Sequence, residues 1–156
     1  MDGAIVTDVA GGPDLEAVRA LFREYGADVS RAYCLKGFEA ELAGLPGAYA
    51  PPGGCLLLLK VAGEPVGTVG MRPLAADIAE MKRLFIRDGF QGRGYGRRLA
   101  EAVVARARGA GYRALRLDTL GHMDAAQNLY RAMGFTDIPA YHADTAPGMR
   151  FMELVL

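Results

Sequence analysis

Residues 91–98 form a glycine-dense turn that reads Gln91-Gly92-Arg93-Gly94-Tyr95-Gly96-Arg97-Arg98. The turn follows an apolar segment at 81–86 and precedes an alanine-rich segment with helical spacing at 99–110. A strand that runs through glycines into a helix brings unpaired backbone N–H groups and the positive end of the helix dipole to one point. Because glycine also lets a ligand approach the main chain closely, the turn predicts a site for a phosphate group. The alternative is an ordinary strand-to-helix turn with a solvated basic face.

The glycine spacing distinguishes among phosphate-binding loops. A Walker A loop needs a Gly-Lys pair followed by Ser or Thr, and the sequence has none. A dinucleotide-binding loop needs a third glycine at position 97, where Arg97 stands. Asp118 lies at the end of the next expected strand, where a ribose-binding acid belongs. This aspartate keeps the dinucleotide interpretation open.

Two sequence blocks together resemble a known family. The loop fits the pattern Gln-x-x-Gly-x-Gly through Gln91, Gly94 and Gly96. A second block, 126–135, fits the pattern A-x-x-L-Y-x-x-x-G-F. In order and separation, the two blocks resemble the GNAT superfamily, the acetyl-CoA-dependent N-acyltransferases. The resemblance is specific from about Glu80 to Phe135 and loose on either side.

The resemblance implies that acetyl-CoA is the co-substrate and that the glycine loop wraps its pyrophosphate. The residues that match this role are Gln91, Gly92, Arg93, Gly94, Tyr95, Gly96 and Arg97. The strand before the loop would bind the pantetheine arm, whose amides hydrogen-bond like an added strand, through Leu84, Phe85 and Ile86. The alternative for these apolar side chains is simple core packing. Met123 departs from the family, which often has an asparagine there, and its thioether cannot donate a hydrogen bond.

Two residues match catalytic roles in the resembled family. Tyr130 matches a frequent general acid, which would protonate the thiolate that leaves the thioester. The alternative is a helical tyrosine packed against Phe135. Glu80 matches a glutamate that serves some members as general base for the amine. The alternatives are an exposed carboxylate paired with Lys82 or Arg83, and a water chain as the base.

The acceptor pocket is expected in the irregular segments, where the family varies its specificity. The candidates are Tyr33, Cys34, Phe38, Asp118, Thr119, Tyr141 and His142. Glu80 and Asp118 would suit a cationic amine, whereas Arg72 and Arg150 would suit a carboxylate-bearing acceptor. The sequence leaves both kinds of acceptor open.

The expected function is transfer of an acetyl group from acetyl-CoA to a primary amine of a small molecule or peptide. The amine would attack directly in a ternary complex. One alternative is a non-catalytic acyl-CoA-binding sensor, and another is a dinucleotide-dependent oxidoreductase. The sequence does not distinguish an acetyl donor from a longer acyl donor.

Composition sets the remaining bounds. A length of 156 residues predicts one domain, 1–156. A formal net charge of zero gives no reason to expect nucleic acid as a partner. The sequence lacks a membrane-length apolar run, and Met1-Asp2-Gly3-Ala4 lacks signal-peptide features, so a cytoplasmic location is expected. With two cysteines and two histidines, neither a disulfide framework nor a metal site is expected. A homodimer is among the expected assemblies.

The hydrophobic pattern predicts an α/β fold with a mixed sheet. The sheet is expected to be largely antiparallel in its N-terminal half, and the resemblance implies splayed central strands. Expected strands are 4–9, 55–62, 65–72, 79–86, 112–119, 135–141 and 149–155. One expected helix begins at an Asp14 cap. Three further helices are expected at 38–42, 93–108 and 124–133.

Overall fold

The computed structural model describes residues 3–30 and 33–156. The expected domain, 1–156, also includes Met1, Asp2, Arg31 and Ala32, which lie outside the described residues, and its extent stays a prediction. The helices are α1 (Gly12–Val29), α2 (Phe38–Ala43), the 3-10 turn η1 (Gly47–Tyr49), α3 (Tyr95–Gly109) and α4 (Asp124–Ala132). The strands are β1 (Ala4–Asp8), β2 (Cys55–Val61), β3 (Glu64–Ala75), β4 (Ile78–Ile86), β5 (Ala114–Thr119), β6 (Thr136–Ile138) and β7 (Arg150–Val155).

The described strands form one seven-stranded sheet in the order β1-β2-β3-β4-β5-β7-β6. Every neighbouring pair is antiparallel except β4 and β5, which run parallel. The crossover between these two strands is α3, as a parallel connection requires. The mixed α/β fold with an antiparallel N-terminal half is therefore confirmed.

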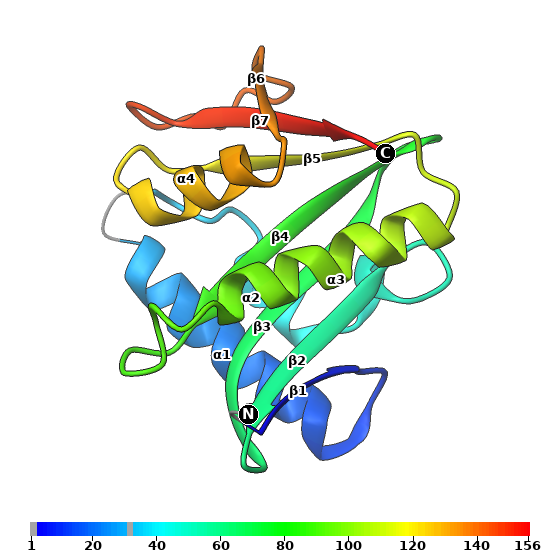
Figure 1. Ribbon diagram of the computed structural model, residues 1–156, viewed down its shortest axis with the longest axis vertical. Helices are drawn as coiled ribbons and strands as arrows, with labels where there is room; N and C mark the ends of the chain where they lie inside the picture. Colours follow the sequence, from blue (N-terminus) through cyan, green and yellow to red (C-terminus); the bar gives the residue numbers. More distant parts are fainter. Residues whose placement is uncertain (1–2, 31–32) are drawn as a thin grey trace.

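Helices cover both faces of the sheet (Figure 1). The leucines of β2 show why, because alternate side chains along a strand point to opposite faces. Leu57 and Leu59 are buried with the apolar residues of α3. Leu56 and Leu58 are buried with those of α1 and α2. An apolar strand buried on both faces needs cover on both sides, and burial of this apolar area drives the assembly.

The two central strands diverge after a short paired stretch. β4 and β5 share three register pairs, from Ile78–Ala114 to Glu80–Arg116. Beyond Glu80, β4 continues to Ile86 without a partner on β5, and Figure 1 shows the two strands separating. The splayed strands implied by the family resemblance are therefore confirmed.

A bulge lies where the strands part. Between the register pairs Thr68–Phe85 and Gly70–Lys82, β4 has one residue more than β3. Arg83 in this bulge takes a φ of +66°, an uncommon backbone conformation for a residue with a side chain. The bulge re-aims the second half of β4 away from β5.

Several expected boundaries differ from those observed, and β3 also extends to Ala75 while β5 begins only at Ala114. Helix α1 begins at Gly12, so Asp14 lies in its first turn rather than capping it, because Pro13 is already suited to the first helical turn. Helix α3 begins at Tyr95 instead of residue 93, because Gly94 has a φ of +82°, which a helix cannot include. The expected strand at 135–141 is shortened to β6, which pairs with β7.

Candidate active site

A groove of about 470 Å³ lies between the end of β4, the glycine turn and α4. It brings together every residue expected at the cofactor site except Arg93, whose guanidinium lies 5.4 Å from the centre of the Phe90 ring. His122 and Met123 line its opposite wall. Expected residues among its lining are Leu84, Phe85, Ile86, Gln91, Gly92, Gly94, Tyr95, Gly96 and Arg97.

The start of α3 gives this groove its backbone donors. Gly94 is the N-cap and has no side-chain cap, and the first helical bond runs from Arg98 N–H to the Gly94 carbonyl. The N–H groups of residues 95–97 therefore have no partner within the helix. A Cβ added at Gly94 would meet no heavy atom within 4 Å, so there is open space beside the backbone here. Glycine is favoured at this position because its φ is left-handed.

Two polar side chains of the turn are engaged within the chain. The Gln91 side-chain amide donates to the Ile86 carbonyl at 2.9 Å and so ties the turn to the end of β4. Arg97 donates to Glu101 at 2.9 Å across one helical turn, where both side chains are more than half exposed. Exposed pairs of this kind are weak, so Arg97 can exchange its partner for an anion at little cost.

A narrow cleft continues from the groove into the gap between β4 and β5. Leu84, Met123 and Ala126 line both the groove and the cleft. Tyr130 and Asp118 line the cleft from α4 and β5. The groove therefore leads to the place where the central strands part.

Tyr130 is buried in this cleft at 6% exposure. Its ring packs against Phe135 with centroids 5.7 Å apart, and no described residue hydrogen-bonds its hydroxyl. Burial raises the pKa of Tyr130 well above its usual value, so the phenol stays protonated through neutral and mildly alkaline pH. The ring of Tyr130 therefore packs against Phe135, as the structural interpretation expects, while its protonated hydroxyl makes no hydrogen bond to a described residue.

A polar pocket of about 250 Å³ opens on the far side of the cleft and shares Lys82, Arg83 and Asp118 with it. The pocket lies on the sheet face that α1 and α2 cover. Its lining residues are Tyr33, Leu35, Lys36, Arg72, Leu74, Glu80, Lys82, Arg83, Asp118, Tyr141, His142 and Asp144.

Glu80 forms part of the wall of this pocket. It is only 1% exposed, so the expected alternative of an exposed strand carboxylate was wrong. Arg72 Nε donates to one carboxylate oxygen at 3.1 Å, and the Tyr141 hydroxyl donates to the other at 2.5 Å. Lys82 Nζ lies 3.8 Å from Glu80. The buried carboxylate is therefore held in one orientation by charged and neutral donors.

Asp118 lies where the cleft and the polar pocket meet. Lys82 Nζ is 3.4 Å from one of its oxygens, and His142 Nε2 is 2.5 Å from the other. Burial by itself would raise the pKa of Asp118, but Lys82 and the His142 hydrogen bond outweigh burial and lower that pKa. Asp118 is therefore an anion at neutral pH.

Some of the residues expected in the acceptor pocket line it or the cleft in the structure, and others lie outside. Tyr33, Asp118, Tyr141 and His142 line the polar pocket, and Thr119 lines the cleft. Cys34 is exposed outside the lining, and Phe38 packs under the Arg83 guanidinium instead. Of the two arginines, Arg72 lines the pocket, whereas Arg150 pairs with Asp137 outside it.

Sequence reasoning missed half of the residues that line the pocket, among them Lys82, Lys36 and Asp144. Lys82 could have been found, because strand alternation puts it on the same face as Glu80. Lys36 and Asp144 are 108 positions apart and meet at 2.8 Å between irregular segments. No local signal predicts that contact.

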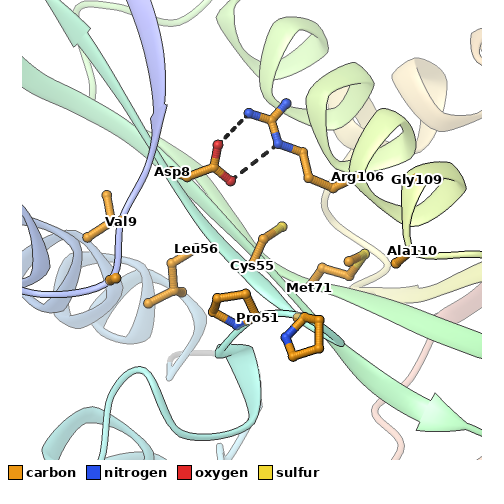
Figure 2. Close-up of a pocket in the computed structure, with 12 residues that line it drawn as sticks. Asp8, Val9, Pro51, Cys55, Leu56, Met71, Arg106, Gly109 and Ala110 are labelled. Atoms are coloured by element: carbon orange, nitrogen blue, oxygen red, sulfur yellow. Dashed lines mark hydrogen bonds and ion pairs between the residues drawn. The ribbon is translucent and has the colours of Figure 1, made fainter.

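A second cavity, of about 350 Å³, lies at the other end of α3 (Figure 2). Its walls are mostly apolar and include Cys55, Leu56 and Met71. Asp8 and Arg106 form an ion pair at 2.7 Å along one side, as Figure 2 shows. None of its lining residues is shared with the groove, the cleft or the polar pocket.

Two general features bear on function. Within residues 3–30 and 33–156, no three His, Cys, Asp or Glu side chains lie close enough together to hold a metal ion. None of the helices in that part of the chain combines the length and apolar character needed to span a bilayer.

Comparison with known proteins gives consistent matches. The model of the Acetyltransferase (GNAT) family matches residues 16–135. An uncharacterized N-acetyltransferase of Schizosaccharomyces pombe is 29% identical over 143 residues, covering 90% of this chain and 88% of the relative. Human N-acetylaspartate synthetase is 31% identical over 127 residues, covering 80% of this chain and 42% of the relative. The structure of yncA from Salmonella typhimurium with its cofactor acetyl-CoA has a TM-score of 0.76 at 17% identity, covering 98% and 94% of the chains.

Proposed function

Because the chain belongs to the GNAT family of acetyltransferases, we propose that it transfers the acetyl group of acetyl-CoA to a primary amine of a small molecule or peptide. The amine attacks the thioester directly in a ternary complex. The observation that carries this proposal is the continuity of the groove, the cleft and the polar pocket through shared lining residues. A cofactor in the groove can thus present its thioester to an amine in the pocket. The name of human N-acetylaspartate synthetase supports an amino-acid acceptor.

The glycine turn binds the pyrophosphate of the cofactor in this proposal. Backbone N–H groups at residues 95–97, the positive helix end and Arg97 provide the attraction. The pantetheine arm lies along Leu84–Ile86, where β4 has no partner on β5 and its backbone can accept an added strand-like ligand. The open space beside Gly94 supports close approach of the phosphate to the backbone.

Tyr130 is the proposed general acid. Attack by the amine expels coenzyme A as a thiolate, and the phenol protonates that sulfur as the C–S bond breaks. The unpaired, protonated hydroxyl in the cleft supports this role.

Glu80 is the proposed acceptor of the amine proton. Its place in the wall of the polar pocket supports this role. Because Glu80 is only 1% exposed, the proton reaches one of its remaining lone pairs through water. We predict that Glu80→Gln removes the fall of kcat/KM on the acid side of the pH profile while acetyl-CoA affinity stays unchanged. A mutant profile that is only scaled down, with its acid side intact, would make Glu80 a positioning residue.

A thiol-release assay over a panel of amines tests the proposed function. We expect acetyl-CoA-dependent thiol release that requires an amine and yields an N-acetylated product by mass spectrometry. Calorimetric titration with acetyl-CoA, coenzyme A and NAD serves as the control for cofactor identity. Acetyl-CoA binding without turnover of any amine favours the sensor alternative, and tight NAD binding favours the oxidoreductase alternative.

A further inference from the structure

A row of alternating charges crosses four strands of the sheet and begins in the polar pocket. Arg72, Glu80, Arg116 and Glu153 are consecutive register partners on β3, β4, β5 and β7. Register partners present their side chains on one face of a sheet. Arg72 contacts Glu80 at 3.1 Å, and Arg116 contacts Glu153 at 2.7 Å. The row therefore divides into two matched pairs, of which only the first lines the pocket.

The charges of the pocket balance one another. Each lining carboxylate has a lining cation within 3.4 Å, and the remaining cation, Arg83, pairs with Glu41 at 2.8 Å. A polyamine needs a surplus of anionic groups, and this pocket has none among its described residues. A ligand that carries both charges can insert itself into such a row without leaving a buried charge unmatched. The matched pairs are Glu80 with Arg72, Asp118 with Lys82, and Asp144 with Lys36.

Arg72 has the free edge that a carboxylate needs. Its side chain is 34% exposed and lines the pocket, so a ligand can reach it. Among the described residues, the guanidinium donates only through Nε, to Glu80. The two terminal nitrogens remain available, and an arginine fork fits a carboxylate in a two-bond arrangement.

Asp118 lines the polar pocket from β5. It lines both the cleft and the polar pocket, so a group held beside it faces the approach of the thioester. Lys82 and His142 fix its two oxygens, and a carboxylate oxygen can accept more than one hydrogen bond. The amino group of an acceptor can therefore join this cluster.

We propose that the acceptor is a free α-amino acid, with its carboxylate on Arg72 and its amino group at Asp118. This inference rests on the proposed function and narrows its acceptor from amines in general to molecules with a free α-carboxylate. Arg72 is then a specificity-determining residue that binds the acceptor and leaves cofactor binding untouched.

The experiment compares kcat/KM for the twenty L-amino acids with their α-amides and with the amines that lack the carboxylate. We expect the best amino acid to exceed its own α-amide by about 10- to 100-fold, the range of a lost charge-assisted hydrogen bond. Because Arg72 also holds Glu80, Arg72→Gln is expected to lower kcat for both kinds of substrate, and the ratio of the two kcat/KM values is the readout. This ratio should fall toward one, because losing the carboxylate contact raises KM for the amino acid and not for its α-amide. Arg72→Lys should restore the preference in part.

Arg150→Gln is the matched control, because Arg150 pairs with Asp137 outside the pocket. It should keep the preference of the wild-type protein. The wild-type ratio tests the proposal even where Arg72→Gln fails to fold. Equal rates for amino acid and α-amide, or a preference for peptides, would overturn the inference while leaving the N-acetyltransferase proposal intact. The proposed function itself fails on a different result, the absence of acetyl-CoA-dependent thiol release with every amine of the panel.

Discussion

The two ends of α3 border different sites: the groove lies at its N-terminal end and the cavity of Figure 2 at its C-terminal end. The two sites differ in the backbone hydrogen-bonding groups that the helix leaves free beside them. At the N-terminal end, Gly94 leaves the first N–H groups of the helix without helical partners beside the groove. At the C-terminal end, the N–H groups of Ala110, Gly111 and Tyr112 donate to carbonyls of the last turn. Arg106 and Arg108 lie in that turn, where they complement the negative helix end.

This difference shows that the volume of a cavity does not by itself identify a ligand-binding site. The cavity in Figure 2 is comparable in volume to the groove, yet its Arg106 is already matched by Asp8 and its walls are apolar. The groove has unused backbone donors and a path to a polar pocket. We therefore expect an anion to bind at the N-terminal end of α3 and not at its C-terminal end.

The largest effect is expected when one tyrosine hydroxyl is removed from the cleft and, as a control, another is removed just after the C-terminal end of α3. Tyr130→Phe should lower kcat by 10²–10⁴-fold, the usual contribution of a general acid, with acetyl-CoA affinity unchanged. Tyr112→Phe removes a hydroxyl that donates to the Gly53 carbonyl at 2.5 Å. This control should cost about 1 kcal/mol of stability and leave kcat intact. A drop of less than about tenfold in Tyr130→Phe would make Tyr130 a packing residue.

The pH dependence of kcat gives a second test of Tyr130 as the general acid. An acid must be protonated to act, and burial raises the pKa of Tyr130 above its usual value of about 10. Tyr130 should therefore cause no loss of kcat as pH rises from about 7 to about 10. An alkaline fall in this range that vanishes in Tyr130→Phe would contradict the buried, protonated phenol.

Valine in place of glycine at each end separates backbone strain from phosphate binding. Gly94 and Gly111 have φ values of +82° and +85°, and neither has a heavy atom within 4 Å of an added Cβ. Both substitutions should therefore cost about 1–3 kcal/mol of stability, measured by denaturant unfolding. Only Gly94→Val should also raise the acetyl-CoA Kd, by at least about tenfold, because its Cβ enters the space beside the helix donors. Equal Kd values for the two folded variants would place the pyrophosphate elsewhere.

The smallest effect is expected in the cavity of Figure 2. Asp8→Asn breaks a pair whose side chains are 63% and 34% exposed. Exposed pairs contribute at most about 1 kcal/mol, so the melting temperature should fall by a few degrees at most and less at high salt. Acetyl-CoA Kd and kcat/KM should not change. A large loss of activity would show that the two ends of α3 are functionally coupled.

The sequence predicted the parts of the molecule that local chemistry specifies. The glycine turn and the block around Tyr130 carry their own spacing, and the groove and cleft contain both. The start of α3 was misplaced by two residues, because glycine allows either sign of φ and the sequence does not say which one is used.

The acceptor pocket was much less predictable. Arg72 and Arg150 were equivalent in the sequence, and only their register in the sheet separates a pocket residue from a surface residue. The burial of Glu80 depends on Tyr141, which approaches from a loop 61 positions away. Contacts of this range come from tertiary packing, and short motifs carry no record of them.

The divergence of β4 and β5 also gives the sheet an edge inside the protein. An unpaired strand edge is a template for aggregation when it faces outward. The outer edges here are short, since β1 has five residues and β6 has three. The longer unpaired edge, beyond Glu80 on β4, lies in the gap that faces β5, with α4 lining the same cleft. The protein thus keeps a row of backbone hydrogen-bonding groups out of reach of a second polypeptide, while a thin, flexible molecule can still enter.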